Sequence, residues 1–221
     1  MKRHLEIACF NLPSAYAAIE AGADRIEFCS DYAAGGLTPN AVDFLKLKSV
    51  CPVPVYVMIR PRGGDFIYNM DETDTMIKQV YEFGNLGADG LVFGNLLPDG
   101  SIDINNNLVL VEAAGNIPCT FHRAFDVSVN YEKNLEDVIK CGFSAVLTSG
   151  RGKSAIEGIN QLEWLIKYAG DNLTIMPGGG VRSSNLAQLM SSLNTSWFHS
   201  SGIVSGEIAD LDEIKLMKAL I

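Results

Sequence analysis

The chain has 221 residues and a net charge of −9, with 17 Lys and Arg against 26 Asp and Glu. Its hydrophobic fraction of 48% can fill a large core, and its charged fraction of 19% excludes a disordered chain. The acidic balance argues against a nucleic-acid partner, because neutralising phosphates needs a basic face. No apolar run reaches the roughly 18 residues of a membrane span, and the amino-terminal MKRHLEIACF has no features of a signal peptide. We therefore expect a cytoplasmic protein without a membrane partner.

The cysteines support the same compartment. There are five, an odd number, and none forms a CxxC pair, so we expect reduced thiols rather than a disulfide framework or a zinc knuckle. They are Cys9, Cys29, Cys51, Cys119 and Cys141.

Short apolar segments rich in Val, Ile and Phe alternate with segments of helical period along the whole chain. The predicted strands are 4–9, 25–29, 54–60, 89–94, 118–123, 144–148, 172–177 and 196–200. The predicted helices begin near Pro13, Pro39, Asp71, Ile104, Tyr131, Ser154 and Ser183, and an amphipathic segment, DLDEIKLMKALI, closes the chain.

Two of these helix starts rest on capping patterns. Thr38 before Pro39 is typical of an N-cap followed by a proline at the first helical position, and Ser154 with Glu157 is typical of a capping box. Eight strand–helix units predict one α/β domain over residues 1–221, a single-domain TIM (β/α)8 barrel. The alternative, an open doubly wound sheet, lacks a GxGxxG after the first strand.

In such a barrel the site lies at the carboxyl ends of the strands. Five of the seven arginines fall there, namely Arg60, Arg62, Arg123, Arg151 and Arg182. Since guanidinium groups bind carboxylate and phosphate, this gathering predicts an anion site, to which we assign Arg60, Arg62 and Arg123. The alternative is ion pairing of these arginines to nearby acidic residues, without a ligand.

Gly178, Gly179 and Gly180 follow the seventh predicted strand. Backbone N–H groups of such a run can bind a phosphate, and the loops after strands seven and eight often do so in these barrels. The alternative is a tight turn.

Glu6 and Glu27 each interrupt an apolar strand. Alternation places Glu6 with His4 and Ala8, and Glu27 with Arg25 and Cys29. If these faces point inward, buried carboxylates need a basic partner or a proton.

We name Glu27 and His122 as candidate catalytic acid/base residues, because His122 stands beside charged residues in FHRAFD. The alternative to this catalytic role is a structural network of glutamates and arginines that fills the barrel. We interpret His199 as a hydrogen-bonded core residue. No HxH, HxxxH or HExxH motif is present, so no tight divalent site is predicted.

Several strings are together similar to the CutC family of copper homeostasis proteins, with matches from Cys9 to about His199. They are ADRIEFCS, VMIRPRGGDF, DGLVFG, TFHRAFD, LTSG, SAIEG and IMPGGGV. The resemblance implies a cytoplasmic, homo-oligomeric TIM-barrel protein of copper homeostasis, with Cys9 and Cys29 as candidate Cu(I) ligands. Soft thiolates suit Cu(I). In the family an arginine often follows the last strand, where this chain has Ser201 and Gly202.

Two functional hypotheses follow. The resemblance favours copper homeostasis with a copper ion as partner, and this is the function we expect. The arginine, histidine and glycine motifs favour an enzyme that acts by acid/base chemistry on a small anionic metabolite, such as a phosphorylated one, at the barrel mouth. Whether the chain is an enzyme stays open at this stage. No organic cofactor is evident, and no strand carries a lysine of the Schiff-base kind.

Overall fold

The computed structural model describes residues 2–221. Its strands are β1 (His4–Cys9), β2 (Arg25–Phe28), β3 (Val55–Met58), β4 (Gly90–Phe93), β5 (Cys119–Phe121), β6 (Ala145–Thr148), β7 (Thr174–Pro177) and β8 (Trp197–Ser200). Its helices are α1 (Leu12–Glu20), α2 (Ala41–Lys48), α3 (Met70–Asn85), α4 (Ile104–Ala114), α5 (Ala124–Val127), α6 (Tyr131–Lys140), α7 (Ile159–Ala169), α8 (Ser183–Ser192) and α9 (Leu211–Leu220).

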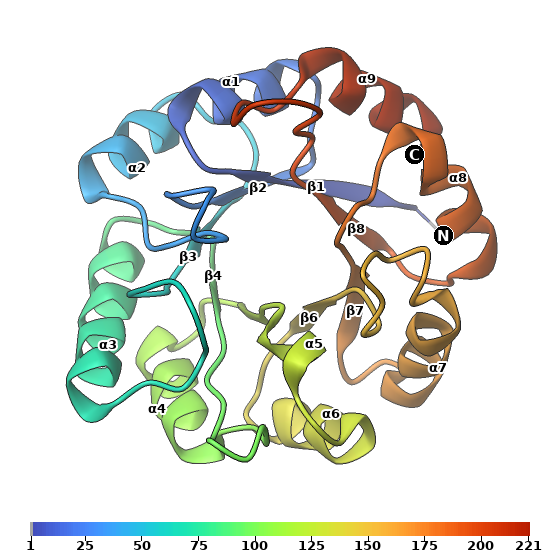
Figure 1. The fold of residues 1–221 in the computed structure, drawn as a ribbon. Coiled ribbons are helices and arrows are strands. Elements are labelled where there is room, and N and C mark those ends of the chain that lie inside the picture. Colours follow the sequence, from blue (N-terminus) through green and yellow to red (C-terminus); the bar gives the residue numbers. More distant parts are fainter. Residues whose placement is uncertain (1) are drawn as a thin grey trace.

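The eight strands are parallel and follow the order β7-β6-β5-β4-β3-β2-β1-β8, with helices outside them (Figure 1). β7 and β8 lie next to each other, and the Thr195 hydroxyl donates to the Ile175 carbonyl at 2.6 Å across this gap. The ring is therefore nearly closed, and the predicted single-domain (β/α)8 barrel is confirmed, as are all eight strands.

Two predicted helix starts are wrong. The Thr38 hydroxyl accepts the Arg60 N–H at 2.8 Å instead of capping a helix, so Asn40 caps α2 and the helix begins at Ala41. The Ser154 hydroxyl does accept the Glu157 N–H, but this contact closes a turn in the loop after β6, and α7 begins only at Ile159.

Side chains alternate between the barrel interior and the helix layer as the strand period predicts. Leu5, Ile7 and Cys9 point outward into the main apolar core. In the interior, the Arg25 guanidinium carbon lies 4.1 Å from the Tyr56 ring centroid and 3.9 Å from that of Trp197. The two strand faces that carry Glu6 and Glu27 therefore point inward.

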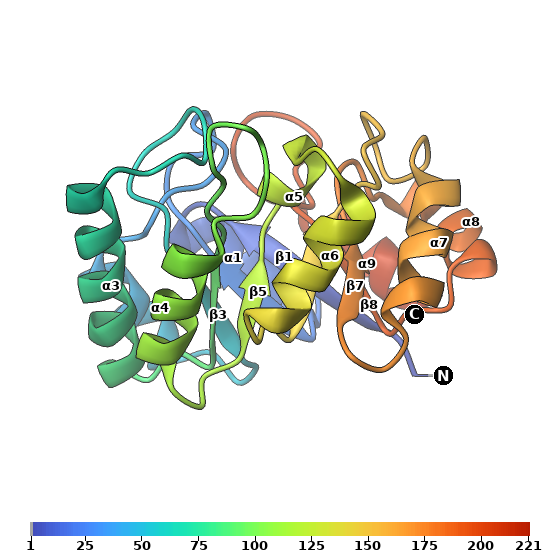
Figure 2. The ribbon, with the colours of Figure 1, turned by 90° about the horizontal axis from the view of Figure 1, so that it is seen from below.

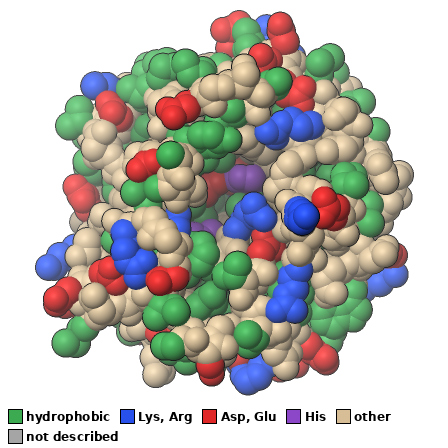
Figure 3. Space-filling view, in the orientation of Figure 1, with side chains coloured by type: hydrophobic (Ala, Val, Ile, Leu, Met, Phe, Trp, Pro, Cys, Tyr) green, Lys and Arg blue, Asp and Glu red, His purple; other side chains and the backbone are tan. Residues whose placement is uncertain are grey.

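The loops that follow the strands gather along one edge of the molecule, opposite the amino terminus (Figure 2). These loops surround a hollow in which histidine, arginine and acidic side chains lie close together (Figure 3). Within residues 2–221, no helix has the length and apolar character that would let it cross a membrane. The fold thus places charged groups at the carboxyl ends of the strands, where barrels of this type carry their sites.

Candidate functional site at the barrel mouth

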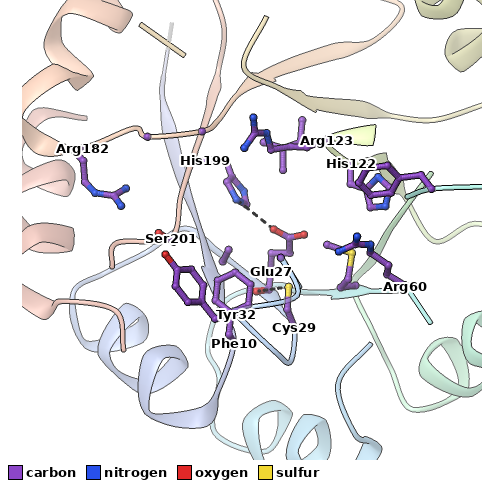
Figure 4. Close-up of a pocket in the computed structure, with 17 residues that line it drawn as sticks. Phe10, Glu27, Cys29, Tyr32, Arg60, His122, Arg123, Arg182, His199 and Ser201 are labelled. Atoms are coloured by element: carbon purple, nitrogen blue, oxygen red, sulfur yellow. Dashed lines mark hydrogen bonds and ion pairs between the residues drawn. The ribbon is translucent and has the colours of Figure 1, made fainter. Parts of the chain in front are cut away.

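A cavity of about 320 Å³ opens at the carboxyl ends of the strands, and we call it the mouth pocket. Its lining includes the ten residues labelled in Figure 4: Phe10, Glu27, Cys29, Tyr32, Arg60, His122, Arg123, Arg182, His199 and Ser201. Acidic, basic, aromatic and sulfur side chains therefore share one space large enough for a small metabolite.

His199 lies between two buried carboxylates. Its Nδ1 is 2.7 Å from Oε1 of Glu6, and its Nε2 is 3.5 Å from Oε2 of Glu27. On the far side of Glu6, Nε of Arg25 donates to Oε2 at 2.5 Å. The register explains this chain of contacts, because Glu6 pairs with both Arg25 on β2 and His199 on β8.

These contacts set the charges of the group. Burial opposes ionisation of Glu6, but the Arg25 charge and the His199 bond outweigh it, so the pKa of Glu6 is lowered. Burial and the Glu6 charge raise the pKa of Glu27 to about 7, although His199 and Arg25 act against them. Burial disfavours protonated His199, but Glu27 and Glu6 more than offset it and raise the pKa of that imidazole. Near neutral pH, Glu27 is thus poised to gain or lose a proton.

Glu6, Glu27 and His199 are also the one group of three His, Cys, Asp or Glu within residues 2–221 whose ligand atoms lie within 4.8 Å of one another. Both oxygens of Glu6 are already bonded, and both nitrogens of His199 face carboxylates. The group is therefore balanced by Arg25 and a proton, and a metal ion would have to displace these contacts.

One atom of this group has no partner. Oε1 of Glu27 is buried and makes no hydrogen bond to any residue of the described chain. Glu27 lines the mouth pocket and points between His199 and Arg60 (Figure 4). An unpaired buried carboxylate oxygen is costly unless a ligand or a proton completes it.

His122 is also brought into the mouth pocket, but it does not contact either carboxylate. Its Nδ1 accepts the Ala124 N–H at 3.4 Å, while Nε2 is buried without a partner among residues 2–221. Burial and the nearby Arg60 charge lower the pKa of His122 to about 3. The imidazole is therefore neutral, and the bond at Nδ1 places its proton on Nε2.

The two arginines of MIRPRGGDF have different surroundings. Arg60 lines the mouth pocket, but its terminal nitrogens donate to three loop carbonyls, those of Ala34, Gly36 and Gly64. Only its Nε, which is buried, lacks a partner within the described residues.

Arg62 lies outside the pocket lining. It pairs with Glu72 at 2.6 Å and with Asp65 at 3.0 Å. For Arg62 the structure shows the ion pairing that the sequence left as an alternative.

Arg123 reaches the mouth pocket from the loop after β5. Its Nε donates to Asp126 at 2.8 Å and one terminal nitrogen donates to the Ser149 hydroxyl at 3.1 Å. Asp126 is itself fixed by the Thr148 hydroxyl and the Ser149 N–H. The side chain of Arg123 is held in place yet 45% exposed, so it can meet an anion from solution.

The glycine run divides into two parts. The Gly178 N–H donates to Thr148 O in the sheet, and Gly178 is not among the residues that line the pocket. Gly179 and Gly180 do line it, with positive φ values of 92° and 72°. A helix terminus does not assist them, because the Glu213 carboxylate accepts the N–H and hydroxyl of Ser183 at the start of α8.

Arg182 follows this run after Val181 and also lines the mouth pocket. It donates to the Ser200 hydroxyl at 3.1 Å and to the Ile203 carbonyl at 2.7 Å. It thus places a guanidinium beside the end of β8. Arg151, by contrast, donates to Val129 O and lies outside the pocket lining.

The two candidate copper ligands lie on opposite faces of the sheet. Cys9 is part of the main core on the helix side, whereas Cys29 lines the mouth pocket. Burial and the Glu27 charge raise the pKa of both thiols well above the ordinary value. Cys29 instead shares a small buried cluster with Met58, whose sulfur is also soft.

Sequence reasoning missed the position of His199 between the carboxylates. The available signal was the alternation of β8: His199 must face inward if β8 closes the ring beside β1, where Glu6 faces inward too. The aromatic wall formed by Phe10 and Tyr32, whose ring centroids are 5.0 Å apart, was also missed.

Comparison with known proteins gives one family. The model of the CutC family matches residues 3–204. A Xanthomonas campestris family protein CutC is 41% identical over 89% of this chain and 82% of its own length. A copper homeostasis protein cutC homolog of Caenorhabditis elegans is 40% identical over 97% of this chain and 86% of its own length.

Solved structures agree. A Streptococcus agalactiae protein assigned to copper homeostasis as CutC superposes with a TM-score of 0.86 at 30% identity, over 91% of this chain and 99% of that one. A phosphoribosyl anthranilate isomerase from Thermotoga maritima gives a TM-score of 0.67 at 17% identity, over 100% and 98% of the two chains. At that identity the second likeness shows the barrel fold alone.

Proposed function

This chain belongs to the CutC family, and we propose that it is an enzyme that moves protons on a small anionic substrate bound in the mouth pocket. The observation that carries the proposal is the free oxygen of Glu27. A buried carboxyl with a pKa of about 7, one unpaired oxygen and a histidine at 3.5 Å has the features of a general base.

His199, which lies between Glu6 and Glu27, supports the role of Glu27 as a general base. Glu6, held ionised by Arg25, keeps the imidazole oriented through Nδ1 and favours its protonated form. The proton on Nε2 then faces Glu27. We infer that His199 adjusts the basicity of Glu27 and that Arg25 and Glu6 act as positioning residues behind it.

The anion would bind to other groups of the pocket lining. This lining includes the guanidinium groups of Arg123 and Arg182 and the residues Gly179 and Gly180. Positive φ at both glycines and the lack of side chains let their backbone approach a ligand closely. Of the arginines assigned to the anion from sequence, Arg123 fits best, Arg60 has one free nitrogen, and Arg62 has no place in this site.

The test is proton exchange between water and substrate. The protein is incubated in D₂O with a panel of small phosphorylated and carboxylated metabolites, and deuterium in each recovered compound is measured by mass spectrometry. We expect incorporation into at least one compound by the wild-type protein and by Glu112→Gln, which changes an exposed residue on α4. Glu27→Gln should reduce it at least about 100-fold. Equal incorporation by Glu27→Gln would overturn the proposal.

A second candidate function is Cu(I) binding, which the names of the relatives favour. The structural observation behind it is the shared cluster of Cys29 and Met58. A thiolate and a thioether are soft ligands suited to Cu(I), and both residues line the mouth pocket. We propose Cys29 with Met58 as the better-placed pair, since Cys9 lies on the opposite face of the sheet.

Copper is the cargo in this second proposal, and a Cu(I) competition titration tests it. Cys29→Ser should lose tight binding, whereas Cys9→Ser should keep it. Loss of binding in both variants would restore the Cys9–Cys29 pair predicted from the sequence. Unchanged affinity in Cys29→Ser would contradict copper binding in the pocket.

We place the protein in the cytoplasm, because all five cysteines are unpaired and free thiols persist in a reducing compartment. A homo-oligomer stays a prediction from the family resemblance, and sedimentation or light scattering would test it.

A further inference from the structure

Two buried N–H groups in the mouth pocket lack an acceptor within residues 2–221. They are Nε2–H of His122 and Nε–H of Arg60. His122 follows β5 and Arg60 follows β3, with β4 between these two strands, and both side chains pack against the ring of Phe66. Buried donors without acceptors are uncommon in folded proteins and need an explanation.

The side chains that carry these donors lie beside the carboxyl group of Glu27, whose Oε1 also lacks a partner within the described residues. Figure 4 shows the Glu27 carboxylate in the middle of the pocket, with His199 on one side and Arg60 and His122 on the other. The pocket therefore places a base opposite a pair of hydrogen-bond donors. The low pKa of His122 keeps its imidazole neutral, and a neutral imidazole is a far weaker acid than a carboxylic acid, so it can donate a hydrogen bond through Nε2–H without losing the proton to Glu27.

We propose that the substrate is a carbonyl compound, and that its carbonyl oxygen binds between the N–H groups of His122 and Arg60 while Glu27 takes a proton from the adjacent carbon. This inference rests on the proposed function and names its substrate class: a small keto or aldehyde metabolite that also carries a phosphate or carboxylate.

The proposed step is a proton transfer from the substrate carbon to Glu27, which forms an enolate. The Glu27 carboxylate accepts the proton, the C–H electron pair forms the C=C bond of an enolate, and the carbonyl π pair moves onto oxygen. The two N–H groups then stabilise the oxygen's negative charge, which is the role of preorganised donors in such reactions. Glu27 can return the proton to the carbon that lost it, so the reaction needs no oxidant or reductant.

Access to the donors depends on Phe66. Its ring centroid lies 4.8 Å from that of His122, and the Arg60 guanidinium carbon lies 4.7 Å from it. Because neither donor nitrogen is open to solvent, the ring has to move as the substrate oxygen enters. Phe66 lies in the loop between β3 and α3, just after Gly63 and Gly64, of which Gly64 has a φ of 84°.

Matched ligand pairs test the proposal. Dihydroxyacetone phosphate is compared with glycerol 3-phosphate, and pyruvate with lactate, so that each pair differs in a carbonyl against an alcohol. We expect the wild-type protein to bind the carbonyl member of one pair about tenfold more tightly. His122→Ala should abolish this preference, and His122→Gln, whose amide N–H can donate, should restore part of it. The preference should persist from about pH 5 to pH 9, because His122 stays neutral throughout.

The outcomes separate this inference from the proposed function. Equal binding within both pairs, binding of neither pair, or a preference that survives His122→Ala would overturn the carbonyl assignment. The proposed function would still stand if deuterium exchange on another anion depended on Glu27. If His122→Ala weakened both members of a pair equally, the residue would have only a structural role and the inference would fail.

Discussion

Oε2 of Glu27 lies 3.5 Å from Nε2 of His199, and the other oxygen of the same carboxyl has no partner among residues 2–221. Glu6 contacts Nδ1 of His199 and fixes the orientation of the ring, and both Glu27 and His199 line the mouth pocket. Its contacts make the protonation of Glu27 sensitive to pH near neutrality, and several predictions depend on that property.

The stability of the protein should fall as the pH rises through neutrality. The pKa of Glu27 is raised from 4.5 to about 7, so its contribution is fully present below pH 4.5 and is lost as the pH rises through about 7. The raised pKa of His199 acts in the same direction above 6.5. Glu27→Gln should reduce the fall in unfolding free energy between about pH 5 and pH 8.5 by roughly 1–3 kcal/mol. Urea unfolding at both pH values measures the free energy of unfolding of each protein. An equal fall in the wild-type protein and in Glu27→Gln would contradict the prediction.

The arginines should differ in their effect on anion binding. Arg123→Ala removes a guanidinium that lines the pocket, and we expect about a tenfold weaker Kd for the anion identified in the exchange assay, equivalent to ~1.4 kcal/mol. Arg62→Ala removes ion pairs to Glu72 and Asp65 that lie outside the pocket, so the Kd should stay within about twofold and the free energy of unfolding should fall by less than about 1 kcal/mol. Calorimetric titration of both variants measures these Kd values. A larger loss of affinity in Arg62→Ala than in Arg123→Ala would contradict the proposed anion site.

Asp126→Asn tests whether Arg123 has to be held in place. Asp126 accepts hydrogen bonds from Arg123, Thr148 and Ser149, and its side chain is 9% exposed. The variant should lose about 1–3 kcal/mol of stability, because buried bonds to a charged acceptor weaken. Anion affinity should also fall severalfold while the pH dependence of exchange stays that of the wild type. Unaltered anion affinity would show that Arg123 is held in position without the carboxylate of Asp126.

Gly179→Ala should damage the site beyond its effect on the backbone. The new Cβ would lie 3.2 Å from Cζ of Arg123 and from Cβ of Ser149, at a φ of 92°. Gly170→Ala is the matched control, since φ is 53° and no atom lies within 4 Å of its new Cβ. Both variants should lose about 1 kcal/mol or more in stability. Only Gly179→Ala should weaken anion binding, and an equal effect on binding would contradict the assignment.

The barrel itself could be predicted from the sequence, because apolar strands, helical periods and turn residues agree along the chain. Alternation within β1 and β2 also defined the strand faces that carry Glu6 and Glu27, and the structure shows that these faces point inward. Alternation within β1 and β2 did not identify the partner of Glu27, which also requires the closure of the ring by β8. His199 becomes its neighbour only because β8 returns beside β1, a contact across 193 residues between His199 and Glu6. The ion pairs of Arg62 could not be chosen over anion binding from the strand pattern, because they depend on how the loop after β3 turns its guanidinium toward Asp65 and Glu72.

The proposed function depends most directly on the raised pKa of Glu27. A ¹³C NMR titration of the side-chain carboxyl signals measures this pKa, and the Glu27→Gln variant identifies the signal. The structure predicts one glutamate carboxyl with a midpoint near pH 7, absent from Glu27→Gln. Its midpoint should rise in His199→Gln, because the favourable charge of the imidazolium is lost. A Glu27 signal that titrates at or below its ordinary pKa of 4.5 would contradict the account.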